Sequence, residues 1–137
     1  MSEHNVPLMG GGMAPYITIR SGRAAEAMDF YKRAFGAEEA ARNQGESGKL
    51  MHGHLLINGS SLLLSDDFPE YTGRETPEPA AVTLHLQVDD ADAWWKRAVD
   101  AGATVKMELA DQFWGDRYGQ LTDPFGHSWS IGATIKR

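Results

Sequence analysis

The chain contains no cysteine, and this absence excludes several kinds of chemistry. Without thiols it can form no disulfide, no thiolate zinc site and no cysteine nucleophile. Long apolar runs are missing as well, because no stretch approaches the roughly 20 residues that a membrane-spanning helix needs. We therefore expect no membrane partner, whereas the redox compartment stays open.

Positive charge is also in short supply. Lys and Arg number 13 against 19 Asp and Glu, which gives a formal net charge of −6. Proteins that bind nucleic acids gather Lys and Arg into patches, so this balance argues against a nucleic-acid partner. The first twelve residues have neither the positive cluster nor the apolar segment of a secretory signal. We therefore expect a cytoplasmic protein.

The residues that are present have the composition of one soluble domain. Of 137 residues, 42% are hydrophobic and 23% charged, and a chain of this size can bury a continuous core. Four tryptophans indicate large aromatic walls in that core or in a pocket. Residues 1–13, which include three consecutive glycines, are expected to form a flexible tail. Residues 14–137 are expected to form a single domain.

The first half of this domain predicts a strand followed by a helix. Residues 16–20 alternate and are rich in β-branched side chains, as in a strand with one buried face. Apolar residues then recur at three- and four-residue spacing as far as Phe35, which is typical of a helix. We expect Ser21 to cap this helix and Gly36 to end it in the left-handed region.

Short strands are expected after the helix. The pattern is weak over 38–42 and clearer over 50–57. An Asn-Gly pair at 58–59 is the strongest short-range hairpin signal, and it leads into a further strand over 61–64. The acidic, proline-containing stretch 66–79 then predicts a loop between two halves.

The second half repeats the order of the first. Residues 82–88 predict a strand, and an aspartate at 89–90 can cap the helix that follows. Gly102 is expected to end that helix as Gly36 ends the first. Two adjacent tryptophans on the helix cannot share a face, so Trp94 is expected in the core and Trp95 partly exposed.

A duplication is the simplest explanation of this repetition, and chance similarity of two unrelated halves is the alternative. Segments 35–38 and 101–104 superpose at an offset of 66 residues, 101 against 35. We predict an α+β fold of tandem βαβββ modules, with module 1 over about 14–66, a linker over about 67–80 and module 2 over about 81–137. The modules are expected to form a curved mixed sheet whose helix-free faces line a shared cleft.

Particular segments resemble a known family. Residues 51–55 and 64–66 resemble one half of the PhnB-like branch of the glyoxalase/bleomycin-resistance/dioxygenase superfamily, the vicinal-oxygen-chelate (VOC) proteins. Residues 113–119 and 123–129 resemble the other half, and the resemblance covers nearly everything from 15 to 134. It implies paired βαβββ modules and a homodimer.

The resemblance also bears on metal binding. Members of the superfamily often hold one divalent metal with four His or Glu side chains, two from each module. By position, these ligands fall at or near Tyr16, at Leu63 or Leu64, at Thr83 and at Ser130. None of these side chains is the imidazole or carboxylate that such a metal prefers. We therefore predict that the usual metal site is absent and that no cofactor is bound.

Three histidines are candidates for contact with a ligand. His52 and His54 lie two residues apart on a predicted strand, so their side chains share a face. We interpret them as ligand contacts or a general base, with structural hydrogen bonds or a relocated metal site as alternatives. His85 shares a strand face with Thr83 and Gln87, and we expect that polar face to look into the cleft.

The segment from Phe113 to Gly119 is the most suggestive of binding. Arg117 can fork onto a carboxylate or phosphonate, and Trp114 and Tyr118 can stack on a flat group. The alternative is an ion pair of Asp116 with Arg117 that only shapes a turn, with Trp114 in the core.

Two functions therefore compete. The first is a small-molecule binding protein, or a metal-independent enzyme of undefined reaction, with a defined set of ligand-facing side chains. These are His52, His54, His85, Trp114, Arg117 and Tyr118. The second is a divalent-metal-dependent lyase, transferase or dioxygenase with ligands relocated to His52 and His54. The residues identify neither the ligand nor the reaction.

Overall fold

The computed structural model describes residues 11–136, so most of the predicted tail lies outside the described residues. Contacts divide the chain into two compact units. The first unit comprises residues up to 32 together with 37–76, and the second comprises residues 33–36 together with those from 77 onward. The boundary at 76 and 77 falls within the predicted linker.

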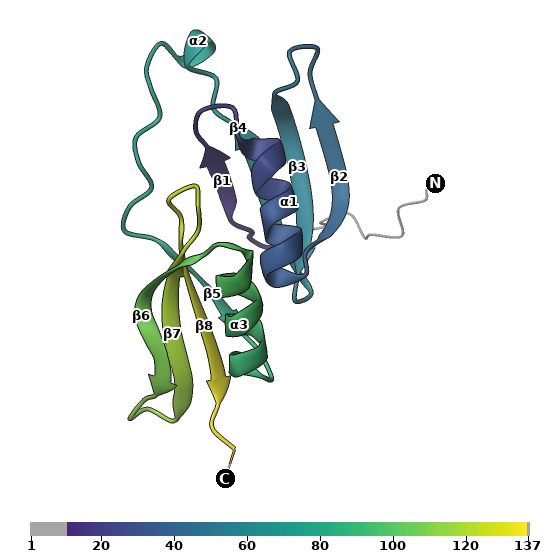
Figure 1. The fold of residues 1–137 in the computed structure, drawn as a ribbon. Coiled ribbons are helices and arrows are strands. Elements are labelled where there is room, and N and C mark those ends of the chain that lie inside the picture. Colours follow the sequence, from purple (N-terminus) through teal and green to yellow (C-terminus); the bar gives the residue numbers. More distant parts are fainter. Residues whose placement is uncertain (1–10, 137) are drawn as a thin grey trace. The chain divides into compact units, whose positions relative to one another are not determined.

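The first unit is a βαβββ module followed by one short helix, except that residues 33–35 at the end of its first helix are grouped with the second unit. Its elements are β1 (Tyr16–Ile19), α1 (Ala24–Phe35), β2 (Glu38–Gln44), β3 (Leu50–Ile57), β4 (Ser60–Asp66) and α2 (Pro69–Thr72). The sheet has the order β1-β4-β3-β2, with β1 parallel to β4 and the other pairs antiparallel (Figure 1). The Asn-Gly turn joins β3 to β4 with positive φ at both residues, as the hairpin prediction requires.

The second unit repeats this plan. Its elements are β5 (Thr83–Gln87), α3 (Ala91–Ala101), β6 (Thr104–Asp111), β7 (Asp116–Thr122) and β8 (Ser128–Thr134). Its strand order, β5-β8-β7-β6, and its strand directions match those of the first sheet (Figure 1). The predicted tandem α+β modules are thereby confirmed. No helix among residues 11–136 is long and apolar enough to cross a membrane.

The two long helices, α1 and α3, each pack against one face of their own sheet at a glycine. A Cβ atom on Gly53 of β3 would lie 2.9 Å from the Met28 sulfur of α1. A Cβ atom on Gly119 of β7 would lie 2.6 Å from a ring carbon of Trp95 of α3. At Gly119 a Cβ atom would also meet the backbone Cα of Leu109 at 2.9 Å, so only glycine lets α3 pack this closely, whereas at Gly53 the nearest atom is the far end of a flexible side chain that can shift.

The expectation that Trp94 lies in the core is wrong, whereas Trp95 is partly exposed as expected. Trp95 packs against the sheet at Gly119, whereas the ring of Trp94 lies under the guanidinium of Arg97, 4.7 Å from its centre. Both indoles are half-buried. Trp94 and Trp95 both flank the buried residues Ala91 and Ala98. The space beside Gly119 therefore decides which of the two indoles packs against the sheet.

The caps of the two helices have different origins. Asp90 accepts a hydrogen bond from the Ala93 amide of α3 at 3.1 Å, as predicted. The prediction that Ser21 caps α1 is wrong, because Ser21 has φ 65° and the helix starts at Ala24. The Ala24 amide instead donates to Asp66 at 2.9 Å. This buried carboxylate also accepts from the Leu50 amide at 2.7 Å, so it joins α1, β3 and β4.

A second buried carboxylate shapes the turn before β8. Asp123 accepts hydrogen bonds from the amides of Phe125 and His127 with one oxygen, at 2.9 and 3.0 Å. Its other oxygen accepts from the indole nitrogen of Trp129 at 2.9 Å. The Asp-Pro-Phe-Gly turn is therefore tied directly to a core side chain.

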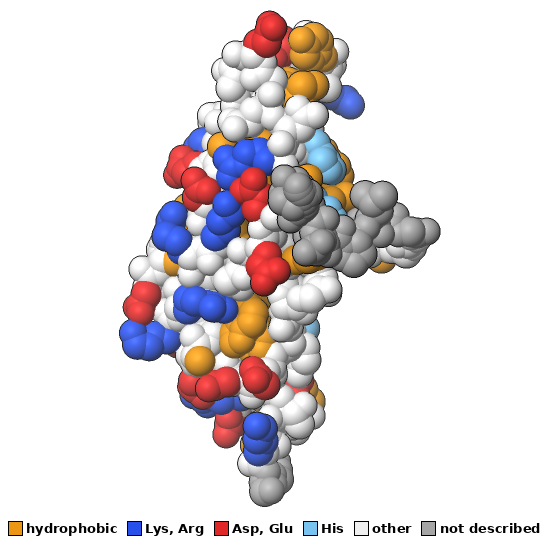
Figure 2. Space-filling view, turned by 90° about the vertical axis from the view of Figure 1, so that its right-hand side faces the viewer, with side chains coloured by type: hydrophobic (Ala, Val, Ile, Leu, Met, Phe, Trp, Pro, Cys, Tyr) orange, Lys and Arg blue, Asp and Glu red, His pale blue; other side chains and the backbone are white. Residues whose placement is uncertain are grey.

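The surface carries charge of both signs. On the face that Figure 2 shows, Lys and Arg side chains are interspersed with Asp and Glu. An example is Glu39, which bonds Lys32 at 2.6 Å and Arg42 at 3.1 Å. The bond from Lys32 is the main reason that the pKa of Glu39 lies below its usual value.

We predict that Gly119→Ala lowers the free energy of unfolding by about 1–3 kcal/mol, as overpacked cores do. The added methyl would meet Trp95 and also the Cα of Leu109 at 2.9 Å, which is backbone and cannot move aside easily. Urea unfolding followed by circular dichroism measures the change. Gly45→Ala is the control, since its Cβ would meet only the flexible end of Met51, at 3.4 Å. Equal stability of the two variants would contradict the packing argument.

Candidate functional site

The candidate site lies on the face of the second sheet that is turned away from α3. Side chains alternate along a strand, so Gly119, which contacts α3, assigns its neighbours in sequence to the opposite face. The strand register then aligns residues from three adjacent strands on that face. They are His85 and Gln87 from β5, Ser130 and Gly132 from β8, and Tyr118 and Gln120 from β7.

Hydrogen bonds connect these side chains into one group. His85 Nδ1 lies 2.7 Å from the Ser130 hydroxyl, and His85 Nε2 lies 2.8 Å from the Gln87 side-chain oxygen. Gln120 donates from its amide nitrogen to the Tyr118 hydroxyl at 3.1 Å. We call His85, Gln87, Tyr118, Gln120 and Ser130 the His85 cluster.

Aromatic rings extend the His85 cluster. The imidazole of His85 stacks on Tyr118 with ring centres 5.8 Å apart and planes at 26°. Trp114 meets the same tyrosine edge-on at 5.5 Å. Trp114 is 50% exposed, and its neighbour Phe113 is 96% exposed. The alternative that Trp114 belongs to the core is therefore wrong, and its ring is open to a ligand.

Gly132 leaves room for the imidazole. A Cβ atom there would lie 3.0 Å from His85 Cε1 and 3.3 Å from the Gln87 oxygen. Gly132 pairs with Gln87 on one side and Tyr118 on the other. The imidazole can therefore reach across β8 and stack on the tyrosine only because this residue lacks a side chain.

The first unit has a counterpart of this arrangement. Gly53 pairs with Leu64 as Gly119 pairs with Ile131, and continuing both registers makes Tyr16 equivalent to His85. The same registers make Leu63 equivalent to Ser130 and His52 equivalent to Tyr118. The rings of Tyr16 and His52 have centres 6.3 Å apart, so each module brings together one tyrosine and one histidine.

His54 lies beside His52 on the helix-free face of the first sheet, as the alternation predicted. Its Nε2 is 2.8 Å from the Ser61 hydroxyl. Burial, and secondly the charge of His52, lower the pKa of His54 below its ordinary value. A neutral imidazole with one nitrogen at Ser61 is therefore the favoured form.

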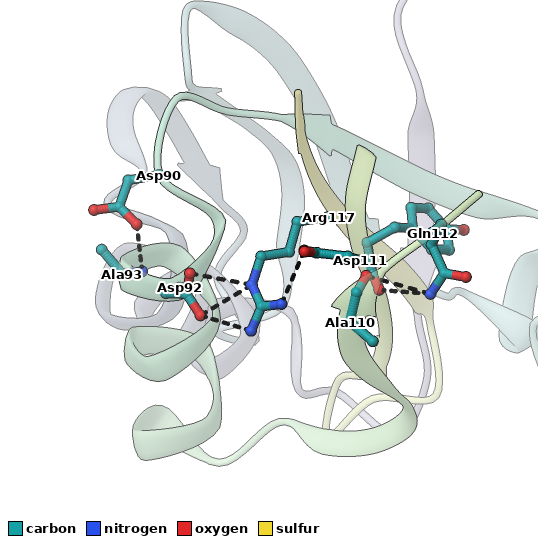
Figure 3. A network of polar contacts seen from close by, with 8 residues as sticks. Asp90, Asp92, Ala93, Ala110, Asp111, Gln112 and Arg117 are labelled. Carbon is teal, nitrogen blue, oxygen red and sulfur yellow. Dashed lines mark hydrogen bonds and ion pairs between the residues drawn. The ribbon is translucent and has the colours of Figure 1, made fainter. Parts of the chain in front are cut away.

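Arg117 is separated from the other predicted ligand residues. It pairs with Ala133 and points to the α3 side of the sheet, opposite to Tyr118. Its guanidinium binds Asp92 of α3 at 3.1–3.2 Å and Asp111 of β6 at 3.1 Å (Figure 3). The bond to Asp92, followed by that to Asp111, raises the pKa of Arg117. The expected partner Asp116 is thus replaced by two other aspartates.

The residues at the superfamily's metal positions do not fit a divalent ion. In the second module the position belongs to His85 rather than Thr83, because Ser130 pairs with His85 whereas Thr83 pairs with Ser128. With Tyr16 and Leu63, the four positions then supply one imidazole and no carboxylate, too few donors for such a metal. Across residues 11–136, no group of three or more His, Asp or Glu side chains is placed to hold a metal.

Sequence reasoning missed three members of this site. It named Gln87 only as a neighbour of His85, and it did not include Gln120 or Gly132 among the site residues. The available signal was that side chains point to alternate faces along a strand. Over residues 116–122 this alternation groups Tyr118 with Gln120 and separates both from Arg117.

Comparisons with known proteins agree with this architecture. The family model of the Glyoxalase/Bleomycin resistance protein/Dioxygenase superfamily matches residues 14–131. The chain therefore belongs to that superfamily, as its sequence segments suggested.

Relatives and solved structures give the same result. An uncharacterised protein of Mycobacterium tuberculosis is 46% identical over 129 residues, covering 90% of this chain and 75% of that protein. The crystal structure of protein PA1353 from Pseudomonas aeruginosa is 25% identical with a TM-score of 0.74, covering 90% and 98%. The PhnB protein of Bacillus cereus shares the fold, with a TM-score of 0.72 at 19% identity over 90% and 100% of the chains.

We predict that His54 makes stability depend on pH in the mildly acidic range. The pKa of His54 is lowered in the folded state. As the pH falls below the ordinary histidine pKa of 6.5, the unfolded chain therefore takes up this proton before the folded protein does. Stability is therefore complete above that pH and declines as the pH falls from there through the folded pKa. Urea unfolding at a series of pH values should show wild type losing stability relative to His54→Gln, which cannot titrate. Parallel curves would contradict the assignment.

Proposed function

We propose that this protein binds a small molecule with a flat, at least partly aromatic group on the helix-free face of its second sheet. The observation that carries the proposal is the His85 cluster together with Trp114. Rings of His85, Tyr118 and Trp114 follow one another on a face where polar groups are already aligned by hydrogen bonds.

The physical character of these side chains supports a flat ligand. Aromatic rings stack on planar groups and lose little conformational entropy in doing so. Trp114 is half exposed, so it offers area that a ligand can cover. Most ligand sites combine apolar walls with a few polar groups that fix orientation. The amides of Gln87 and Gln120 can supply that orientation without a charge.

The proposal does not require a metal. A metal-dependent lyase, transferase or dioxygenase would need donors beyond His52 and His54, and no third His, Asp or Glu joins them within residues 11–136. His54 Nε2 is moreover engaged with Ser61. A reaction, if the protein catalyses one, would then depend on hydrogen bonding and proton transfer by its own side chains.

We predict that Tyr118→Leu and Trp114→Leu each weaken binding of a flat aromatic probe about five- to tenfold, because each removes a stacking partner. Thermal shift with 1-naphthol, indole and 1-indanone identifies a probe, and titration calorimetry then gives its affinity. Tyr71→Leu is the matched control, since Tyr71 is 84% exposed on α2 and outside the cluster. Equal affinities of the Tyr118 and Tyr71 variants would contradict the proposed site.

We also predict that the protein purified without a histidine tag holds no stoichiometric divalent metal. Elemental analysis per mole of chain, before and after dialysis against a chelator, measures this. Chelation should leave probe binding unchanged. A near-stoichiometric metal that is lost in His52→Ala or His54→Ala would contradict the proposal and support the metal-dependent alternative. The homodimer that the resemblance implies stays a prediction, which light scattering tests separately.

A further inference from the structure

The hydrogen bonds around His85 determine which of its nitrogens carries the proton. A neutral imidazole has one N–H donor and one acceptor nitrogen. The side-chain oxygen of Gln87 can only accept, so Nε2, at 2.8 Å, must donate to it. Nδ1 is then the acceptor, and the Ser130 hydroxyl at 2.7 Å donates to it.

The two hydrogen-bond partners of His85 differ in how easily another molecule can replace them. Ser130 is 1% exposed, so water cannot replace it as the partner of Nδ1. Gln87 is exposed and stands on β5, an edge strand of the sheet. Its side-chain oxygen is therefore open to competition from a ligand acceptor for the Nε2 proton. The Nε2 proton is therefore the one that an incoming molecule can claim.

The ring is also fixed in place. Gly132 provides the space beside Cε1, and Tyr118 stacks on the imidazole plane. A donor that is already oriented loses less entropy when it binds than a free side chain does. His85 thus combines a defined tautomer with a defined direction of its N–H bond.

We infer that His85 donates its Nε2 proton to the ligand, in the tautomer that the acceptor oxygen of Gln87 selects before binding. This inference rests on the proposed function and narrows its ligand class. The ligand carries a neutral acceptor, such as a carbonyl oxygen, at the edge of its flat group, where it takes the place of the Gln87 oxygen. A flat cation without a lone pair at that edge does not satisfy this donor.

The tautomer is tested first, without any ligand. Imidazole 15N shifts in NMR spectra recorded at pH 8.5 distinguish Nε2–H from Nδ1–H, and the His85→Phe variant assigns the signals. We expect the Nε2–H form in wild type and a mixture of both forms in Gln87→Ala, which removes the accepting oxygen. The Nδ1–H form in wild type would overturn the inference whatever the behaviour of the Gln87 variant.

The ligand class is tested with a matched pair of probes. 1-Indanone and indane have nearly the same shape, and only indanone has a carbonyl. The affinity ratio of indanone to indane should fall about fivefold from wild type to His85→Phe, which keeps a ring but removes the donor.

The outcomes separate the two proposals. Binding of both probes at Tyr118, with the same ratio in wild type and His85→Phe, would overturn this inference and leave the proposed function standing. Weaker binding in Tyr118→Leu with a reduced ratio in His85→Phe supports both. Failure of both probes to bind would contradict the proposed ligand class and, with it, this inference.

Discussion

The close contact of each helix with a glycine of its sheet is the constraint on which the candidate site depends. Gly53 lets α1 lie against β3, and Gly119 lets α3 lie against β7. Because a strand exposes successive side chains on opposite faces, one fixed contact determines the direction of every neighbour. His52 and Tyr118, each one residue before its glycine, are thereby turned away from the helix. A shift of one residue at either glycine would exchange the buried and open faces.

This alternation also separates two chemistries that are adjacent in sequence. Arg117 and Tyr118 are neighbours, yet the arginine turns to α3 and binds Asp92 and Asp111, whereas the tyrosine stacks on His85. The Arg117 side chain is 36% exposed, so these ion pairs contribute little to stability, as is usual for ion pairs near the surface. They nevertheless satisfy both sides of the guanidinium fork and leave the open face of the sheet without this charge. The open face therefore presents rings, amides and one imidazole.

Periodicity and turn chemistry were sufficient to predict the modules from the sequence, because these signals are local. The Asn-Gly hairpin, the glycines that end both helices and the cap at Asp90 each depend on residues a few positions apart. The cap of α1 could not be found in this way, since Asp66 lies 42 residues from the amide it accepts. The order of Trp94 and Trp95 failed for a similar reason, because a glycine on another element decides it. Likewise, the site residues on β3, β5 and β7 were found individually, but their contacts depend on the register.

The two modules share one plan, yet their open faces differ. Register makes Tyr16 equivalent to His85 and His52 equivalent to Tyr118, so the tyrosine and histidine stand on opposite strands in the two modules, with their rings close together in each. The partner of the first ring on the neighbouring strand differs as well, since Tyr16 pairs with Leu63 and His85 pairs with Ser130. Leu63 offers no side-chain hydrogen bond, whereas Ser130 bonds one nitrogen of the imidazole and the Gln87 oxygen bonds the other. The fold thus supplies the same pair of rings twice, and in the second module hydrogen bonds at both nitrogens orient the imidazole.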